Sequence, residues 1–452
     1  MAKHLFGTDG IRGVAGEYPL DDATVYAAGT ALARHIAAHR GTNSSPAQVV
    51  VGMDTRESSR PLAELLAGGL DAGGVAVLFA DVLPTAGVAY LTEKGGLAAG
   101  VMISASHNPF EDNGIKVFVS SGFKLPDDQE HALEIEILRL LEQKPQPRRK
   151  TLQTDPSLAE RYFRHVLGIV NPSQALSRLR VIVDCANGAA FRLGPKLLDI
   201  LGVSAEVIGD KPDGRNINLN CGSLYLEDLQ RKVVEAGADL GIAFDGDADR
   251  ALFVADDGSV VNGDVVLLLA ADYLAGRNHL NGKVVVGTVM SNMGLEKALA
   301  DSGVELARTP VGDKYVLEEM NRRGAVLGGE QSGHIIFREF ATTGDGLVTA
   351  RMVLEVLASS QQPLSELRQR LTVFPQKLEN IRVKRKTPFE QIPALAEAVR
   401  GAERELGDRG RVLVRYSGTE PLVRIMVEAC DPADVERHTG QLAQVFREKL
   451  GA

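Results

Sequence analysis

The feature that most constrains the fold is a repeated alternation of short β-branched runs, polar loops and helix-forming segments. Near the start of the chain, residues 48–52 and 75–79 have strand composition, and apolar residues recur at helical spacing over 21–40 and from Pro61 to about Ala72. A charged helix is expected at 127–142. Strands that alternate with helices in this way form parallel sheets with crossover helices. The sequence therefore predicts an α/β fold.

Three of the β-branched runs resemble one another and begin at Gln48, Arg180 and Lys283. Their spacing of more than ~100 residues is too long for a solenoid repeat, so we expect three similar α/β domains with mixed sheets. After Pro363 the pattern changes to three strand-like runs and two helices, one from near Pro388 to Leu406 and the other from Pro432. This pattern predicts a smaller C-terminal α+β domain. The expected domains are 1–150, 151–256, 257–370 and 371–452.

Composition restricts the classes of function. The 452 residues are 44% hydrophobic and 24% charged, as in soluble globular proteins, and no stretch approaches the ~20 apolar residues of a membrane span. The net charge of −9 disfavours nucleic acid or an anionic membrane as the main partner, so the binding of an anion requires basic residues gathered locally. The three cysteines lie far apart in the sequence, so we expect reduced thiols rather than a disulfide framework. We therefore expect a soluble cytoplasmic protein.

The stretch Met102-Ile103-Ser104-Ala105-Ser106-His107-Asn108-Pro109 stands out among the loops. Its first two residues have the character of a buried strand end, and an Asn-Pro turn follows the small residues. A hydroxyl presented where a strand opens into a loop is common at the sites of α/β proteins. An ordinary serine-rich loop would have the same composition, and the stretch alone does not separate the two interpretations.

An acidic loop lies between two strand-like runs, 240–244 and 251–254, and contains Asp245, Asp247 and Asp249. Three carboxylates this close repel one another unless they share a cation, and oxygen ligands suit Mg²⁺. An EF-hand is excluded, because Arg250 and Asp256 stand where that loop needs Gly and Glu. A solvated acidic turn is less favoured, since the flanking strands imply burial.

Two further polar loops lie between strand-like runs. One contains Glu330, Ser332 and His334, whose side chains can bind sugar hydroxyls and carry a proton. The other covers residues 415–421, with Arg424 beyond it, and combines arginines, hydroxyls and a glycine in a manner suited to phosphate. Taken alone, either loop is also compatible with a plain hairpin.

Together these segments resemble the α-D-phosphohexomutase superfamily, and within it the phosphoglucosamine mutase branch. The resemblance rests on five motifs in order along the chain: Phe6-Gly-Thr-Asp-Gly-Ile-Arg-Gly13, Ile103-Ser-Ala-Ser-His-Asn-Pro109, Asp245-Gly-Asp-Ala-Asp-Arg250, Gly329-Glu-Gln-Ser-Gly-His334 and Arg415-Tyr-Ser-Gly-Thr-Glu-Pro421. It implies four domains around a central cleft, each contributing one loop.

The resemblance also implies a reaction. Ser106 would carry a phosphoryl group and donate it to the 1-hydroxyl of glucosamine 6-phosphate. The resulting glucosamine 1,6-bisphosphate would reorient and return its 6-phosphate to Ser106, leaving glucosamine 1-phosphate for UDP-N-acetylglucosamine synthesis. One Mg²⁺ per chain would be held by the phosphoserine and the three aspartates of the acidic loop. Ser104 favours the glucosamine branch over phosphoglucomutases and phosphomannomutases, which remain the alternative.

Further roles follow from the same resemblance. Lys116 and His334 match positions implicated in proton transfer, and Arg12 would offset the transferring charge. The residues expected to bind substrate are Glu330 and Ser332 for the sugar and Arg415, Ser417, Gly418, Thr419 and Arg424 for the distal phosphate. The expected partner is a small hexosamine phosphate, and a homodimer is possible for this family. A sugar-phosphate sensor without turnover and a simple phosphatase are the rivals from other classes.

Overall fold

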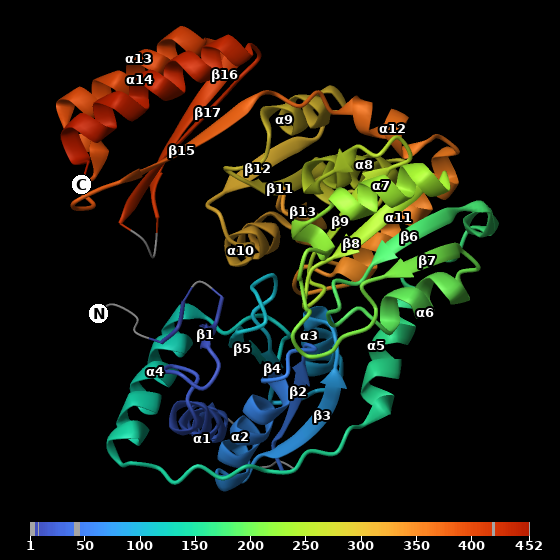
Figure 1. Cartoon of the computed structure of the whole chain (residues 1–452), viewed down its shortest axis with the longest axis vertical. Helices are drawn as coiled ribbons and strands as arrows, with labels where there is room; N and C mark the ends of the chain where they lie inside the picture. The colour runs from blue at the N-terminus through green and yellow to red at the C-terminus, as the bar shows by residue number, and fades with distance from the viewer. Residues whose placement is uncertain (1–4, 8, 40–45, 418–420, 452) are drawn as a thin grey trace. The chain divides into compact units, whose positions relative to one another are not determined.

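The computed structural model describes residues 5–7, 9–39, 46–417 and 421–451. The chain divides into two compact units (Figure 1): one comprises Met1–Thr288 and Ala307–Gln369, the other Val289–Leu306 and Arg370–Ala452. Within the described ranges, no helix combines the length and the apolar character needed to cross a membrane.

The first sheet has the strand order β1-β5-β4-β2-β3. Strands β2, β3 and β4 run parallel, whereas β5 is antiparallel to both β4 and β1, so the sheet is mixed. The elements of this region are β1 (Ile11–Val14), α1 (Asp22–His39), β2 (Gln48–Met53), α2 (Ser59–Ala72), β3 (Ala76–Val82), α3 (Thr85–Lys94), β4 (Ala99–Ile103), β5 (Asp112–Val119), α4 (Asp127–Glu142) and α5 (Pro156–Gly168).

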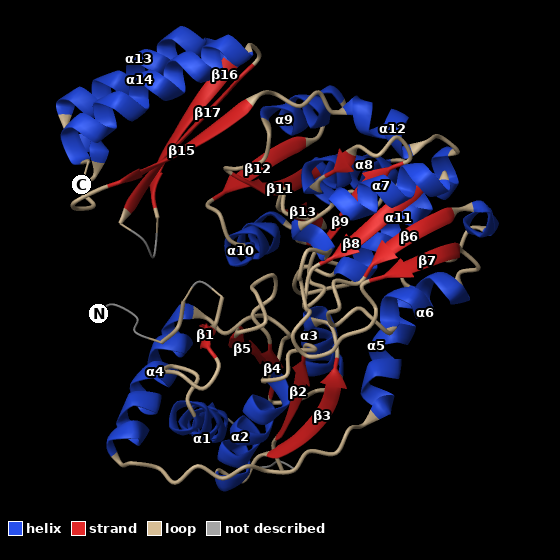
Figure 2. Ribbon diagram, in the orientation of Figure 1, coloured by secondary structure: helices blue, strands red, loops and turns tan. Residues whose placement is uncertain are grey.

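Alternate residues of β2 face two different helical layers. Val49 and Val51 belong to a core shared with α1, α2 and α4. On the other face, a Cβ on Gly52 would lie 2.5 Å from Val88 of α3. The period of two along a strand explains this division, and helices therefore cover both faces of the sheet (Figure 2). The loops after β2 and β4, at residues 54–58 and 104–111, begin where these buried strands end.

Two more sheets follow, with strand orders β10-β9-β8-β6-β7 and β12-β11-β13-β14. The elements of the second region, which contains the sheet β10-β9-β8-β6-β7, are β6 (Arg180–Asp184), α6 (Leu193–Ile200), β7 (Ser204–Ile208), α7 (Glu227–Ala236), β8 (Leu240–Phe244), β9 (Ala251–Ala255) and β10 (Val260–Val261). Those of the third region are α8 (Gly263–Ala275), β11 (Val284–Thr288), α9 (Met293–Asp301), β12 (Glu305–Thr309), α10 (Asp313–Arg323), β13 (Leu327–Gly329), β14 (Ile335–Phe337), α11 (Gly346–Ser360) and α12 (Leu364–Leu367).

The last sheet is antiparallel, with the order β15-β17-β16, and packs against two helices. Its elements are β15 (Gln376–Arg382), α13 (Pro393–Leu406), β16 (Gly410–Tyr416), β17 (Leu422–Ala429) and α14 (Pro432–Leu450). The prediction of three α/β regions with mixed sheets and a smaller α+β region is confirmed. One helix predicted near 388 begins instead at Pro393, after a short 3₁₀ turn at Phe389–Gln391.

Candidate active site

The serine loop that follows β4 carries a strained residue. Ser106 is only 1% exposed, and its backbone lies in the left-handed region with φ +55°. A residue other than glycine in this region costs on the order of 1–3 kcal/mol, so the surroundings must hold it there.

Two side chains bind the carbonyl oxygens of this loop. The Nη2 atom of Arg56 donates to Ser106 O at 3.0 Å and to Asn108 O at 2.9 Å, and its Nη1 donates to the carbonyl of Pro109. From beyond β7, Asn218 Nδ2 donates to the carbonyls of Ser106 at 2.9 Å and Asn108 at 3.0 Å. The strained conformation is thus fixed from two sides by segments far apart in the sequence.

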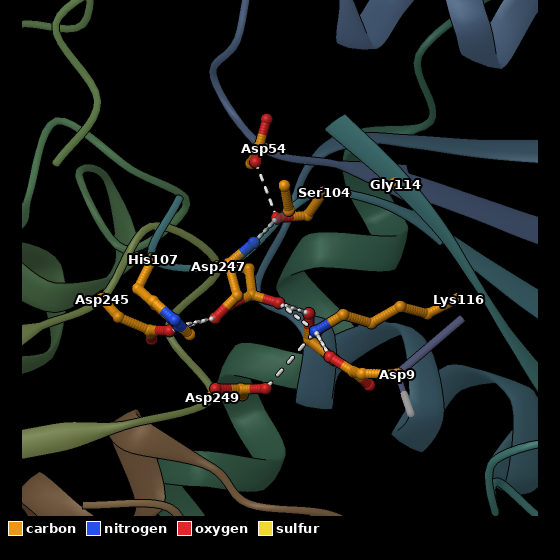
Figure 3. A network of polar contacts seen from close by, with 12 residues as sticks. Asp9, Asp54, Ser104, His107, Gly114, Lys116, Asp245, Asp247 and Asp249 are labelled. Atoms are coloured by element: carbon orange, nitrogen blue, oxygen red, sulfur yellow. Dashed lines mark hydrogen bonds and ion pairs between the residues drawn. The ribbon is translucent and has the colours of Figure 1, made fainter. Parts of the chain in front are cut away.

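Asp54 ties Arg56 to the two serines. Its Oδ2 accepts a hydrogen bond from Arg56 Nε at 2.8 Å and one from Ser104 Oγ at 2.6 Å (Figure 3). Ser104 Oγ in turn accepts one from the backbone N–H of Ser106 at 2.9 Å. The side chains of Asp54 and Arg56 are fully buried. The hydroxyl of Ser104 is therefore engaged in loop structure, whereas Ser106 Oγ donates to Asp245 Oδ2 at 2.7 Å.

The acidic loop connects β8 to β9 and faces Ser106. Its three aspartates are all buried, each offers an oxygen within 4.8 Å of the others, and they are Asp245, Asp247 and Asp249. In the described part of the chain, Oδ1 of Asp247 finds no hydrogen-bond partner, and Oδ1 of Asp249 has only longer contacts, to His334 Nδ1 at 3.5 Å and Arg250 Nε at 3.7 Å. Converging buried carboxylates with unused oxygens fit a hard cation such as Mg²⁺.

The pKa values of Asp245 and Asp249 in the acidic loop shift in opposite directions. Burial and the charges of Asp249 and Asp247 raise the pKa of Asp245 well above its ordinary value. Burial also favours the protonated form of Asp249, but Lys116 and His334 outweigh it and hold the pKa of that carboxyl well below its usual range. Asp245 thus lacks the positive charge that Lys116 and His334 supply to Asp249.

Lys116, on β5, is the main cation of the acidic loop. Its Nζ lies 2.8 Å from Asp247 Oδ2, 3.1 Å from Asp9 Oδ2 and 3.5 Å from Asp249 Oδ2. Burial lowers the pKa of a lysine, but these three carboxylates outweigh that effect and raise it. Lys116 is therefore an ammonium ion at neutral pH.

Two histidines differ in their surroundings. Burial and the nearby Arg250 and Arg12 lower the pKa of His107 to about 4, so its imidazole, 3.3 Å from Ser106 Oγ, is neutral at pH 7. His334 lies next to acids instead, and although burial opposes protonation, Asp249 and Asp313 raise its pKa.

The ring of His334 has a different partner on each nitrogen. The backbone N–H of Gly344 donates to Nε2 at 2.9 Å, which places the proton of the neutral ring on Nδ1, 3.5 Å from Asp249 Oδ1. A second proton, on Nε2, would face Asp313 Oδ2 at 3.4 Å. Protonation of His334 would therefore exchange the hydrogen bond from Gly344 for a contact with Asp313.

The remaining predicted residues of the first unit are Arg12, in β1, and Glu330 and Ser332, in the turn between β13 and β14. Arg12 pairs with Asp9 and donates to the carbonyl of Ala105 at 3.4 Å, directly beside the serine loop. Glu330 accepts a hydrogen bond from the backbone N–H of Gly312 at 3.1 Å and one from Ser332 Oγ at 3.5 Å. The bond from Gly312 holds the turn between β13 and β14 against the start of α10, and the bond from Ser332 lies within that turn.

The predicted phosphate loop belongs to the second unit. Arg415 of β16 and Arg424 of β17 are direct cross-strand partners, and burial together with Arg424 lowers the pKa of Arg415. Like charges in this arrangement repel, which favours an anion beside them. Ser417 is buried, and its carbonyl accepts a hydrogen bond from Lys386 Nζ at 2.6 Å. Gly418 and Thr419 lie outside the described residues.

The sequence analysis missed several residues that shape this site: Asp9, Asp54, Arg56, Lys124, Asn218 and Asp313. Asp9 stands inside the first motif, three residues before Arg12, and offered the clearest signal. For Asp54 and Arg56 the only signal was a polar loop directly after a buried strand.

Comparison with known proteins agrees with this architecture. Four family models of phosphoglucomutase/phosphomannomutase match in order: α/β/α domain I at residues 3–144, α/β/α domain II at 160–258, α/β/α domain III at 262–374 and the C-terminal domain at 378–445. The chain belongs to the phosphoglucomutase/phosphomannomutase family.

Among individual relatives, the chain is similar to proteins named phosphoglucosamine mutase. The chain is 52% identical to a phosphoglucosamine mutase of Solibacter usitatus, covering 100% of both chains, and 50% identical to one of Koribacter versatilis, covering 99% and 98%. Among solved structures, a phosphoglucomutase/phosphomannomutase family protein of Burkholderia thailandensis matches with a TM-score of 0.82 and 26% identity, over 100% of both chains. N-acetylphosphoglucosamine mutase of Aspergillus fumigatus shares the fold, with a TM-score of 0.65, 18% identity and coverage of 99% and 96%.

Proposed function

We propose that this protein is a phosphoglucosamine mutase, which interconverts glucosamine 6-phosphate and glucosamine 1-phosphate. The observation that carries the proposal is the hydrogen bond of Ser106 Oγ to Asp245, in a strained loop that faces three buried aspartates. Relatives of that name are 50% and 52% identical over essentially the whole chain.

The reaction consists of two phosphoryl transfers. In the first, the 1-hydroxyl oxygen of glucosamine 6-phosphate attacks the phosphorus of phospho-Ser106, the bond from phosphorus to Oγ breaks, and the hydroxyl proton is taken up by a nearby base. Glucosamine 1,6-bisphosphate then reorients, and Ser106 Oγ attacks the phosphorus of its 6-phosphate. The bond from phosphorus to the sugar 6-oxygen breaks, the proton lost by the serine hydroxyl is replaced by one on that oxygen, and glucosamine 1-phosphate and phospho-Ser106 remain. Such in-line transfer depends mainly on positioning and on neutralisation of charge.

Side chains around Ser106 meet both needs. Arg12 contacts the carbonyl of Ala105 and Lys116 lies among the acids, so each brings positive charge next to the transferring group. Lys116 and His334 are the proposed proton carriers. His334 suits that role because each of its ring nitrogens has an acceptor or a donor in reach.

The three aspartates and the phosphate on Ser106 would hold one Mg²⁺ per chain. When bound, the ion would neutralise charge on the phosphoryl group, as divalent cations do in phosphoryl transfer. The raised pKa of Asp245 and the Oδ1 atom of Asp247, which has no hydrogen-bond partner among the described residues, support this assignment.

Substrate recognition divides between two loops. Glu330 and Ser332 would bind sugar hydroxyls, and the distal phosphate would bind the loop of the second unit through Arg415, Ser417, Gly418, Thr419 and Arg424. The paired arginines support the second assignment, because two adjacent guanidinium groups attract a dianion. We propose that each of the four domains, 1–150, 151–256, 257–370 and 371–452, supplies one of these loops. A cytoplasmic location and a homodimer remain predictions.

The test is the comparison of kcat/KM on glucosamine, glucose and mannose 1-phosphates, with Mg²⁺ and the corresponding bisphosphate present. The proposal predicts the highest value for glucosamine 1-phosphate. A higher value for glucose or mannose 1-phosphate would assign the chain to phosphoglucomutase or phosphomannomutase activity instead. Binding without turnover would indicate a sensor, and release of inorganic phosphate at the rate of isomerisation would indicate a phosphatase.

A further inference from the structure

Six side chains of alternating acidic and basic character form a closed ring beside the serine loop. Consecutive members lie 3.1, 2.5, 2.5, 3.4, 3.5 and 3.5 Å apart. In order they are Lys116, Asp9, Lys124, Asp313, His334 and Asp249, which contacts Lys116 again. The ring thus links both proposed proton carriers to each other by two routes, one of which passes through Lys124.

Lys124 is the one member of this ring that contacts neither the acidic loop nor a proposed proton carrier. Its Nζ donates to Asp9 Oδ1 and to Asp313 Oδ2, both at 2.5 Å. Asp9 precedes β1, whereas Asp313 is the first residue of α10, 189 residues beyond Lys124. Burial disfavours its charge, but Asp313 and Asp9 outweigh that effect and raise the pKa of Lys124. The ammonium group therefore joins two distant segments of the first unit.

The two acids that Lys124 joins each hold one proton carrier. Asp9 Oδ2 contacts Lys116, and Asp313 Oδ2 faces His334 Nε2. Without the ammonium group, two partly buried carboxylates would be left facing each other, and the charge of Asp9 already opposes ionisation of Asp313. Asp9 and Asp313 would then separate or take up protons. In either case their contacts with Lys116 and His334 would change.

We propose that Lys124 is a positioning residue for phosphoryl transfer, which holds Asp9 and Asp313 in place and through them orients Lys116 and His334. This inference rests on the proposed function, because it concerns the two groups assigned there to proton transfer. A residue that acts on orientation alone affects the chemical step and leaves substrate binding nearly unchanged.

Three variants test the inference: Lys124→Met, Lys124→Arg and the control Lys196→Met. Lys196 pairs with Glu160 at the surface, so its loss removes a comparable charge far from chemistry. We expect Lys124→Met to lower kcat about 10- to 100-fold with KM within about threefold of wild type. Lys124→Arg should recover most of kcat, because a cavity of about 490 Å³ beside Lys124 has room for the longer side chain. The control should match wild type.

A double variant separates positioning from folding. Lys124→Met/Asp313→Asn removes the facing charge, so its melting temperature should exceed that of Lys124→Met, while its kcat should stay low. Recovery of kcat together with melting temperature would show a purely structural role and overturn the inference. A wild-type kcat in Lys124→Met, or a large rise in KM, would overturn it as well. If wild type itself does not interconvert the hexosamine phosphates, the proposed function fails instead.

Discussion

Gly246 is the residue of the acidic loop that lies against the carbonyl of Ser106, and its replacement by alanine tests how closely the acidic and serine loops must approach. A Cβ on Gly246 would lie less than 3.0 Å from the carbonyl oxygen of Ser106, 2.8 Å from Nδ2 of Asn218 and 2.9 Å from Cδ1 of Ile217. Ordinary contacts of this kind begin at 3.4 Å. The carbonyl cannot yield without moving the serine loop, and Asn218 is fixed by its bonds to that loop.

Gly246→Ala should therefore push the loops apart by about 1 Å, a displacement that can reduce the rate of a positioned reaction about 100-fold. We expect kcat for glucosamine 6-phosphate to fall 10- to 100-fold, and the Mg²⁺ concentration for half-maximal activity to rise. Both are measured by steady-state kinetics across a Mg²⁺ series. Gly440→Ala is the matched control, because no atom lies within 4 Å of its added Cβ. A kcat for Gly246→Ala within threefold of wild type would refute the reasoning.

Three further predictions follow from buried charges. Arg56→Met leaves Asp54 buried without its partner, so urea unfolding should show a loss of about 3–5 kcal/mol, and a loss below about 1 kcal/mol would contradict the loop account. Asp247→Asn should abolish the rise in melting temperature that Mg²⁺ gives wild type, and an unchanged rise would exclude Asp247 as a ligand. Burial raises the pKa of Asp345 to about 6, so stability contributed by its protonated form is present below about pH 4 and lost as pH rises through 6. We therefore measure the free energy of unfolding of wild type and Asp345→Asn by urea at pH 4.5 and pH 7.5. From the lower to the higher pH, the stability of Asp345→Asn relative to wild type should rise by about 2 kcal/mol. An unchanged difference between the two proteins would contradict the raised pKa of Asp345.

Local pattern predicted much of the fold. The helix expected at 127–142 lies at Asp127–Glu142, because its apolar spacing, acidic first turn and preceding proline all agree. The helix expected from Pro61 begins instead at Ser59. Proline is tolerated throughout a first turn, whose N–H groups have no partner within the helix, so it marks a helix start only approximately.

The site was predictable where its residues are neighbours in sequence. The three aspartates follow one buried strand within five residues, and the structure places them together. Arg56 and Asn218 donate hydrogen bonds to the carbonyl of Ser106 and lie 50 and 112 residues from it in the sequence. Every residue has such a carbonyl oxygen, so the sequence does not mark this one as an acceptor. The spacing of apolar residues along the sequence therefore cannot predict these contacts. The bridge from Lys124 to Asp313 is hidden for the same reason, since it depends on how separate sheets pack.

The role of Ser106 as carrier of the phosphoryl group is tested most directly by mapping phosphate on the protein. Wild type and Ser106→Ala are incubated with glucosamine 1,6-bisphosphate, and intact mass and peptide analysis follow. The account predicts one phosphate on Ser106 in wild type, its loss on addition of excess glucosamine 6-phosphate, and no phosphate in Ser106→Ala. Phosphate on Ser104, or turnover by Ser106→Ala at the wild-type rate, would contradict it.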